Sequence, residues 1–243
     1  TSIPPAISPL ERLGIFTQMV GKFRSNLHFD GRLQLAQALA QFLDTLEREG
    51  LSLDGLDHLV RDEFANHWQL TLDFLNILRT VYPAYLANAG KIDPVRRQNM
   101  LLSALCTYWT EHPPKTPVIA AGITGSIKST RPLLKCIHHL PAGEVIIPSY
   151  IRDFDPSILQ EGHVQHPYTE LSSMITDIGG TWEDIDIWSG VSDAERYEQN
   201  LKNRTDFILH SMMPAEKTGE WMTPSISIDF AKGFENFEVC EAD

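Results

Sequence analysis

The stretch that decides the fold runs from residue 117 to residue 129 and reads Pro-Val-Ile-Ala-Ala-Gly-Ile-Thr-Gly-Ser-Ile-Lys-Ser. Its first five residues form a short apolar run, which is typical of a buried parallel strand. The glycines that follow predict a turn, and a helix is expected from about 129 to 139. A second apolar run, 143–148, predicts a second buried strand. Strand, helix and strand in this order predict one βαβ unit. Two strands make a marginal sheet, so we expect the native chain to supply further strands.

The turn between the first strand and the helix almost matches the phosphate-binding pattern G-x-x-x-x-G-K-[ST]. The exception is Ile127, which stands where the pattern requires a glycine that lets backbone amides turn inward around a phosphate. A β-branched side chain resists that conformation. A glycine-rich turn, with Ser126 or Ser129 near the helix cap, is therefore favoured over a nucleotide site. If the turn does bind a nucleotide, the candidate residues are Gly122, Thr124, Gly125, Ser126, Lys128 and Ser129.

The regions on either side of the βαβ unit are expected to be largely helical. The whole chain is therefore predicted to be mixed α/β and mostly helical, with a helical domain at 1–115, the strand–helix–strand unit at 116–150, and a helical and loop region at 151–243. Three helices are expected in the first region: 31–49, capped by Asp30 and stopped by Gly50; about 65–81, with an end or kink at Pro83; and 94–111, capped by Asp93 and stopped by His112-Pro113-Pro114. Two more are expected after the βαβ unit: about 167–178, stopped by Gly179-Gly180, and one from the capping box Ser192–Glu195 to about 212. Residues 149–165 are expected to be a loop, and 226–228 and 237–240 are short apolar or alternating runs.

Composition limits the possible functions. The 243 residues carry a net charge of −12, so the chain alone is expected to bind DNA weakly. No apolar run reaches the roughly 18 residues of a membrane span, and a cytoplasmic protein is expected. The cysteines, Cys106, Cys136 and Cys240, are odd in number, far apart and without a CxxC pair. We interpret them as buried thiols rather than a disulfide framework or a zinc site.

The other polar clusters are expected to be structural. No catalytic residue and no metal ligand is assigned. Surface positions are expected for His138, His139, His163 and His166; solvated loop and cap positions for Asp153, Asp155, Glu183, Asp184 and Asp186; and packing positions for Trp68, Trp109, Trp182, Trp188 and Trp221.

Several segments in consistent order resemble the AddB family in the form found in alphaproteobacteria. The resemblance covers roughly residues 30 to 243. It is carried by Pro117 to Ser126, Leu133-Leu134, Leu140 to Gly143, Val145 to Pro148, Glu63 to Leu75, Tyr82 to Leu86, Ile92 to Pro94, Met212 to Trp221 and Phe237 to Ala242.

The resemblance implies a piece of a helicase-like N-terminal half, with a parallel sheet of the P-loop helicase type and a passage into a second helicase-like lobe. Such a subunit pairs with an AddA-type motor and meets DNA through the whole complex. An iron–sulfur cluster and nuclease carboxylates are expected only in a C-terminal part, so no cofactor is expected in this segment. Because the chain starts at Thr1 without methionine and stops within an apolar run, we expect it to be an excised piece.

Three functions follow from the residues and the resemblance. The first is a non-catalytic scaffold and DNA-handling segment of a double-strand-break repair subunit. The second is a nucleotide-binding, ATPase-like domain that uses the turn at 122–129. The third is a protein-binding helical module.

Overall fold

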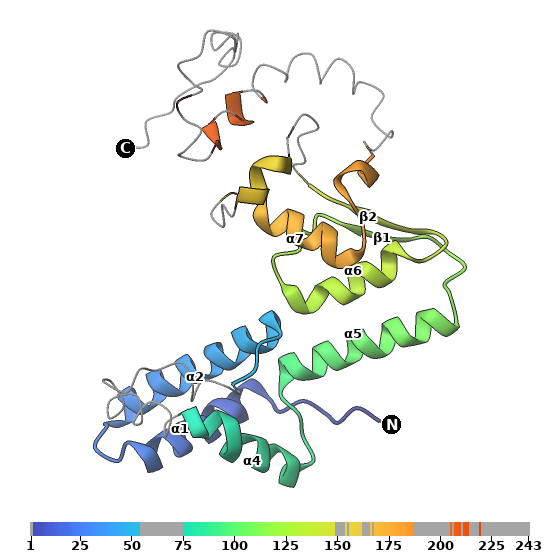
Figure 1. The fold of residues 1–243 in the computed structure, drawn as a ribbon. Helices are drawn as coiled ribbons and strands as arrows, with labels where there is room; N and C mark the ends of the chain where they lie inside the picture. The colour runs from blue at the N-terminus through green and yellow to red at the C-terminus, as the bar shows by residue number, and fades with distance from the viewer. Residues whose placement is uncertain are drawn as a thin grey trace, which may run out of the picture. The chain divides into compact units, whose positions relative to one another are not determined.

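The computed structural model describes residues 2–53, 75–148, 154, 156–161, 166, 168–186, 205, 207–209, 211–213 and 219 (Figure 1). The chain divides into two compact units. The first unit comprises Thr1–Val118 and Ile127–Glu144, and the second comprises Ile119–Ser126 and Val145–Asp243. The described residues are mostly helical with a small two-stranded parallel sheet, which confirms the mixed, mostly helical prediction. The predicted domain boundaries near 115 and 150 stay predictions.

The first unit is built from helices. They are α1 (Pro9–Phe23), α2 (Phe29–Glu49), the π-helical turn η3 (Ile77–Val81), α4 (Tyr82–Ala89), α5 (Pro94–Glu111), the 3₁₀ turn η4 (Lys128–Thr130) and α6 (Arg131–His138).

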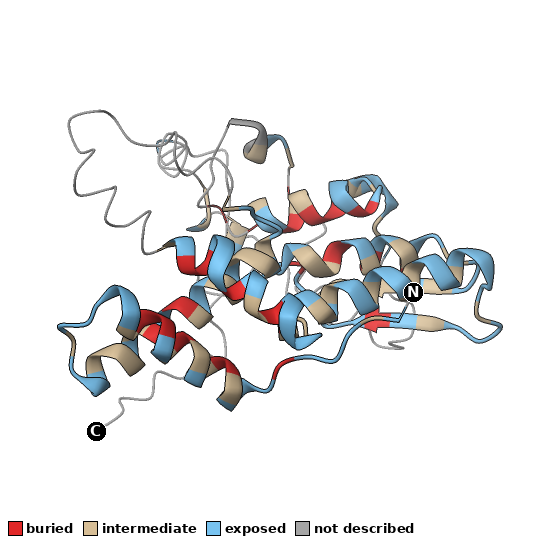
Figure 2. Ribbon diagram, turned by 90° about the horizontal axis from the view of Figure 1, so that it is seen from below, coloured by how far each residue is buried: buried red, intermediate tan, exposed pale blue. Residues whose placement is uncertain are grey.

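Helix α1 begins where its sequence carries two start signals. The Ser8 hydroxyl accepts a hydrogen bond from the Glu11 N–H at 3.2 Å, and Pro9 takes the first helical position, where no N–H is needed. Buried side chains recur along one side of the helix, at Arg12, Phe16, Met19 and Val20. Figure 2 shows such buried stripes on the helices of this unit. This spacing lets α1 pack along α2.

The core of the first unit joins α1 and α2 to the helices that follow. Its two largest fully buried side chains, Phe16 and Tyr82, meet with ring centroids 4.5 Å apart. The other buried members of the cluster are Ile7, Met19, Val20, Ala36, Leu39, Ile77, Leu78 and Leu86.

Helix α2 begins two residues earlier than predicted. His28, not Asp30, is the N-cap residue, and Asp30 lies inside the first turn, where a carboxylate still favours the positive end of the helix dipole. The predicted stop is confirmed, because Gly50 ends the helix in the left-handed conformation with φ of 64°.

The helix was predicted to end or kink at Pro83, and it does not end there. Helical residues run through the proline, because the π-helical turn Ile77–Val81 precedes it. The Tyr82 N–H donates to the Ile77 oxygen five residues back, and Pro83 falls at the start of α4, where its missing N–H costs little. Most of the predicted helix 65–81 lies outside the described residues.

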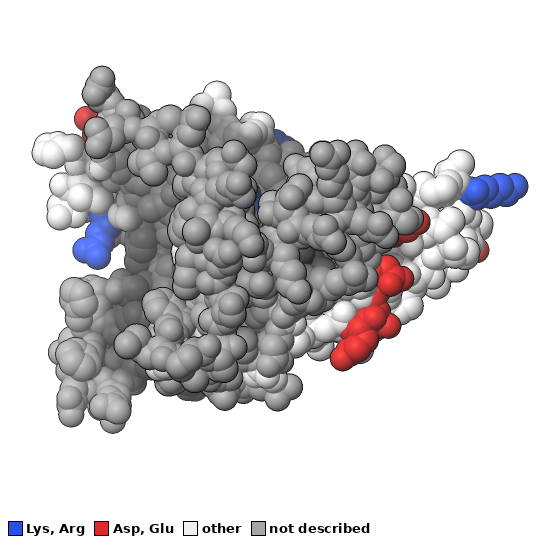
Figure 3. Space-filling model, turned by 90° about the horizontal axis from the view of Figure 1, so that it is seen from above, with Lys and Arg blue, Asp and Glu red and all other residues white. Residues whose placement is uncertain are grey.

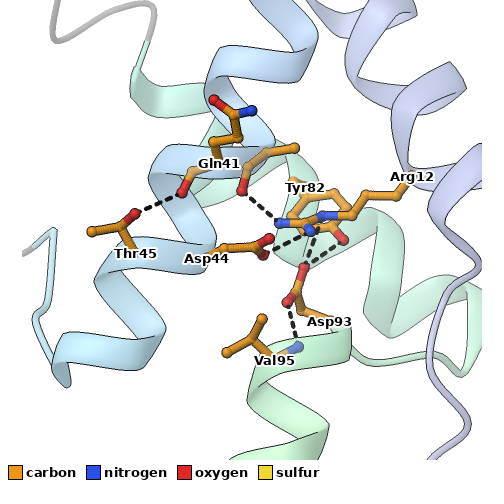
Figure 4. Close-up of polar contacts among 8 residues, drawn as sticks. Arg12, Gln41, Asp44, Thr45, Tyr82, Asp93 and Val95 are labelled. Carbon is orange, nitrogen blue, oxygen red and sulfur yellow. Dashed lines mark hydrogen bonds and ion pairs between the residues drawn. The ribbon is translucent and has the colours of Figure 1, made fainter. Parts of the chain in front are cut away.

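A buried ionic network ties four helices together (Figure 4). Arg12 Nη1 lies 2.8 Å from Asp44 Oδ1, and Arg12 Nε lies 3.1 Å from Asp93 Oδ2 without hydrogen-bond geometry. The Tyr82 hydroxyl donates to Asp93 Oδ2 at 3.0 Å, while Asp93 Oδ1 accepts from the Val95 N–H at 3.1 Å. Burial, together with the Asp93 carboxylate, raises the pKa of Tyr82 well above its usual range. The predicted cap Asp93 is thus confirmed and also serves as the counter-ion of Arg12.

The two predicted strands are present as β1 (Val118–Ala121) and β2 (Gly143–Ile146), which pair in parallel with α6 between them in sequence. They are not buried as predicted. Ala120 is the buried residue of β1, Ile119 is 54% exposed, and no residue of β2 is buried. Among the described residues this sheet has two strands, so it lacks the neighbours that would cover a central strand.

A close backbone approach fixes the entry to β2. A Cβ atom on Gly143 would collide with the backbone oxygen of Ile137 at the end of α6 and would lie 2.9 Å from Leu140 Cβ. Glycine is therefore required for steric reasons at this point of the βαβ unit.

The second unit contains η5 (Pro156–Glu161), α7 (Thr169–Ile178) and η6 (Trp182–Asp184). Helix α7 confirms the predicted helix, and Gly179 ends it with φ of 91°. The expected loop at 149–165 contains the 3₁₀ turn η5, and its remaining residues are largely outside those described. The predicted helix from Ser192 is described in pieces, with helical positions at 205, 207–209 and 211, and the runs at 226–228 and 237–240 lie outside the described residues.

No helix in the described ranges combines the length and apolar character needed to cross a membrane.

Candidate functional site

The glycine-rich turn leaves β1 and leads into α6 through the 3₁₀ turn η4. Gly122 and Gly125 both adopt the left-handed conformation, with φ of 73° and 67°. Gly122 lies in the open, and a Cβ atom there would meet nothing within 4 Å. Gly125 is buried. Both positions favour glycine through their backbone conformation, and Gly125 also does so through its surroundings.

Gly125 packs against Met174 on the buried side of α7. A Cβ atom at Gly125 would overlap the Met174 sulfur and Cγ and would lie 2.8 Å from its Cβ. Met174 is fully buried, at 0% exposure, so its side chain has little room to withdraw. The space beside this glycine is therefore filled by protein side chain.

The backbone beyond Gly125 is engaged within the turn itself. Ile127 is extended, with φ of −94° and ψ of 106°, and its oxygen accepts both the Thr130 N–H at 3.1 Å and the Thr130 hydroxyl at 2.7 Å. A phosphate loop would instead leave amides at the helix start free to donate to the phosphate. The Thr130 amide is already committed to an internal bond.

The polar candidates lie mostly at the surface. The Thr124 hydroxyl donates to the Ser126 hydroxyl at 3.3 Å, and both residues are exposed. The Lys128 side chain is 51% exposed and its ammonium lies 4.0 Å from Glu49 Oε2 at the end of α2. Ser129 is partly exposed. The structure thus brings Thr124 and Ser126 together. Lys128 instead pairs with the Glu49 carboxylate, which belongs to another helix.

The division between the two units falls inside this turn. Gly122, Thr124, Gly125 and Ser126 belong to the second unit, and Lys128 with Ser129 belongs to the first. The assignment of a nucleotide to these six residues stays a prediction.

The histidines divide between surface and interior. His138 and His139 are exposed as predicted, with ring centroids 5.2 Å apart. His166 is buried, at 8% exposure, so its predicted surface position was wrong. Its Nδ1 accepts the Tyr168 N–H at 3.0 Å, and this local bond compensates for burial of a polar ring. His163 lies outside the described residues, and the described ones contain no group of three potential metal ligands.

An aromatic cluster surrounds His166 in the second unit. Phe154 lies 4.6 Å from Tyr168 and 5.6 Å from Trp182, between ring centroids. The packing role predicted for Trp182 is therefore confirmed. The other described tryptophan, Trp109, is partly buried on α5, and Trp68, Trp188 and Trp221 lie outside the described residues.

The acidic loop after α7 is a capping structure, as predicted for Asp184. Its carboxylate accepts the Thr181 N–H at 2.7 Å, and the Thr181 side chain accepts the Asp184 N–H, so the two residues form a capping box for η6. The Thr181 hydroxyl also lies 2.9 Å from the Asp184 carboxylate. Glu183 and Asp186 are exposed, and Asp153 and Asp155 lie outside the described residues. A hollow of about 430 Å³ beside this turn is lined by Pro156, Leu159, Ser172, Ile175, Thr176, Gly180, Thr181, Trp182 and Glu183.

Two of the cysteines differ from their predicted state. Cys106 and Cys136 are partly exposed rather than buried, and the packing of α5 on α6 brings them into contact although 30 positions separate them in sequence. Sequence spacing carries no information about such tertiary proximity, which is why the pair was missed. Cys240 lies outside the described residues.

Comparison with protein-family models, with curated proteins and with solved structures gives no match. The AddB resemblance therefore rests on the residues that carry it.

Proposed function

We propose that the chain is a non-catalytic, helicase-like segment of an AddB-type subunit, with a scaffolding and DNA-handling role in the repair of bacterial double-strand breaks by homologous recombination. In this proposal the strand–helix–strand unit belongs to a P-loop-helicase-like core, and residues 151–243 pass into a second lobe.

The observation that carries the non-catalytic part of the proposal is the packing of Gly125 against Met174. The turn occupies the place where an active phosphate loop would hold its ligand, between a strand and a helix. A buried methionine fills the space beside its central glycine, and the Thr130 amide bonds to Ile127. Both features support a structural role for the turn, in which it packs against neighbouring residues and does not bind a ligand.

The acidic charge of the chain supports a proposal in which DNA is contacted by the whole complex rather than by this chain alone. The net charge is −12, and a phosphate-binding surface needs clustered Lys and Arg. On the face in Figure 3, none of the described parts carries a continuous basic stripe.

The surface of α5 supports a protein partner, proposed to be an AddA-type motor subunit. Val95 is the buried residue of this long helix, while Leu101 and Tyr108 are 42% and 58% exposed. Seven residues apart, these two lie on one helix face. Exposed apolar side chains that share a face are suited to contact with another protein.

The experiment is co-purification of the tagged chain with an AddA-type motor subunit. We expect retention of the motor by the wild-type chain and loss of retention by the double variant Leu101→Glu/Tyr108→Glu. Ser103→Glu/Thr107→Glu is the matched control, because it adds two charges at exposed positions of the same helix that lie away from the face of Leu101 and Tyr108. Failure of the wild-type chain to retain the motor would contradict the proposal. Retention that all three proteins share would contradict the role of α5.

The second candidate function is nucleotide binding. The observation that favours it is the order of strand, glycine turn and helix, with Gly122 at φ of 73° and the Thr124 and Ser126 hydroxyls exposed. It requires Lys128 to leave Glu49 and engage a phosphate, so substitution of Lys128 separates the two candidates. A protein-binding helical module without any link to DNA repair is the third, and it would bind a partner other than the motor.

A further inference from the structure

The contact between α5 and α6 contains two thiols from distant parts of the sequence. The Cys136 thiol donates to the Cys106 backbone oxygen at 3.9 Å, and the Cys106 thiol donates to the Pro132 backbone oxygen at 3.8 Å. Each thiol therefore lies against the backbone of the helix that carries the other cysteine. Both residues belong to the first unit, so their proximity lies within one compact body.

Each of the two helices is held in place by contacts that do not involve the cysteines. Helix α5 is fixed at its start by the cap Asp93, which is bonded to Val95 and paired with Arg12. Helix α6 buries Leu134 and Ile137, on the turn that also carries Cys136. The two cysteines therefore lie at one packed contact between α5 and α6, and both are partly exposed to solvent.

We propose that Cys106 and Cys136 form an oxidisable dithiol, which a small-molecule disulfide converts into an intramolecular disulfide that joins α5 to α6. One thiol, as its thiolate, attacks a sulfur of the small disulfide and releases one small thiol. The second cysteine then attacks the resulting mixed disulfide at the protein sulfur and releases the second small thiol. The two cysteines lose two electrons and two protons, and the small disulfide gains them.

The environment of Cys106 makes the part that this thiol takes in the exchange depend on pH. Burial, and then the neighbouring Cys136 thiol, raises the pKa of Cys106 to about 11. The thiolate is the reactive form, so little of Cys106 is reactive near neutral pH and its share of the exchange accelerates as pH rises.

The disulfide would enclose the chain from residue 106 to residue 136, which contains β1 and the whole Gly122–Ser129 turn. Closing a loop of this length restricts the unfolded chain, and the melting temperature is expected to rise by roughly 10 °C on oxidation. The cross-link would also fix α6 to α5 at the exit from the turn.

The test treats the whole chain with oxidised glutathione and digests it with trypsin without reduction. Trypsin places Cys106 in peptide 98–115, Cys136 in peptide 136–152 and Cys240 in peptide 233–243. We expect peptides 98–115 and 136–152 to be linked, faster formation at alkaline pH, and a higher melting temperature. Cys106→Ser and Cys136→Ser should each abolish the rise in melting temperature and trap a glutathione adduct on the remaining cysteine. Cys240→Ser should behave as the wild-type chain.

Three results would overturn the proposal. They are glutathione adducts on both Cys106 and Cys136 without a link, a link that involves peptide 233–243 instead, and unmodified cysteines after prolonged alkaline treatment. Circular dichroism of each serine variant confirms that it is folded. If one serine variant fails to fold, the linked peptide of the wild-type chain still decides the question.

Discussion

Replacing Arg12 by methionine is expected to destabilise the first unit by about 3–5 kcal/mol, because it leaves a buried carboxylate without its cation. The Arg12 side chain is 8% exposed and pairs with Asp44, at 22% exposure, and Asp93, at 4%. Water can solvate Asp44 after the change, but it reaches Asp93 poorly. Methionine retains most of the apolar stem, so the loss reports the charge rather than a cavity. Urea unfolding followed by circular dichroism measures it through the midpoint and slope.

Two further variants separate this cause from a general effect of substitution. Lys91→Met removes the ammonium that lies 2.6 Å from Glu11 Oε2, but at a site in contact with solvent, so we expect a much smaller loss. Adding Asp93→Asn to Arg12→Met removes the unpaired charge and should recover most of the stability. A loss below about 1 kcal/mol for Arg12→Met, or no recovery in the double variant, would show that Arg12 does not offset the buried Asp93 charge.

Three other predictions concern the βαβ unit and a half-buried carboxylate. Gly125→Ala should lower the free energy of unfolding by about 2–5 kcal/mol and Gly122→Ala by about 1–2 kcal/mol, because both positions need positive φ but a Cβ at Gly125 also overlaps Met174. In a Met174→Ala background, Gly125→Ala should be less destabilising. Equal losses for the two glycine variants in urea unfolding would contradict the packing of Gly125 against Met174. Gly143→Ala should be strongly destabilising, because its Cβ would meet a backbone oxygen, and a melting temperature like that of the wild type would contradict this. Burial raises the pKa of Glu47, so the folded chain disfavours the charged carboxylate, and Glu47→Gln should stabilise it at pH 7. That gain should vanish below about pH 4, where the carboxyl is protonated in both folded and unfolded chains, and urea midpoints at the two pH values test this.

Local signals in the sequence predict much of the fold. Asp93 followed by Pro94 specifies a helix start, and Gly50 specifies a stop, because capping and positive φ depend on nearby residues alone. The strand–turn–helix–strand order around Gly122 follows in the same way from a change in apolar period. These elements were predicted to within a few residues.

The features that the sequence did not reveal depend on distant parts of the chain. In the sequence, nothing distinguishes Arg12 from other charged helix residues. Its buried partners Asp44, Tyr82 and Asp93 come from α2, α4 and the start of α5. Ile119 follows a buried-strand pattern, yet it is 54% exposed because burial depends on neighbouring strands. The same limit applies to the candidate site. The motif located the turn, but the Met174 side chain that fills the space beside Gly125 comes from a helix more than 40 positions away.

We propose that the Gly122–Ser129 turn is a packed structural element of a non-catalytic segment. Calorimetric titration with ATP and Mg²⁺ tests it most directly, with wild-type chain, Lys128→Ala and Lys135→Ala compared. Lys135 is the matched control, because it is an exposed lysine on α6, the helix that follows the turn. If the turn is packed as proposed, none of the three proteins gives saturable heat. Saturable binding by the wild type that Lys128→Ala abolishes and Lys135→Ala retains would contradict it.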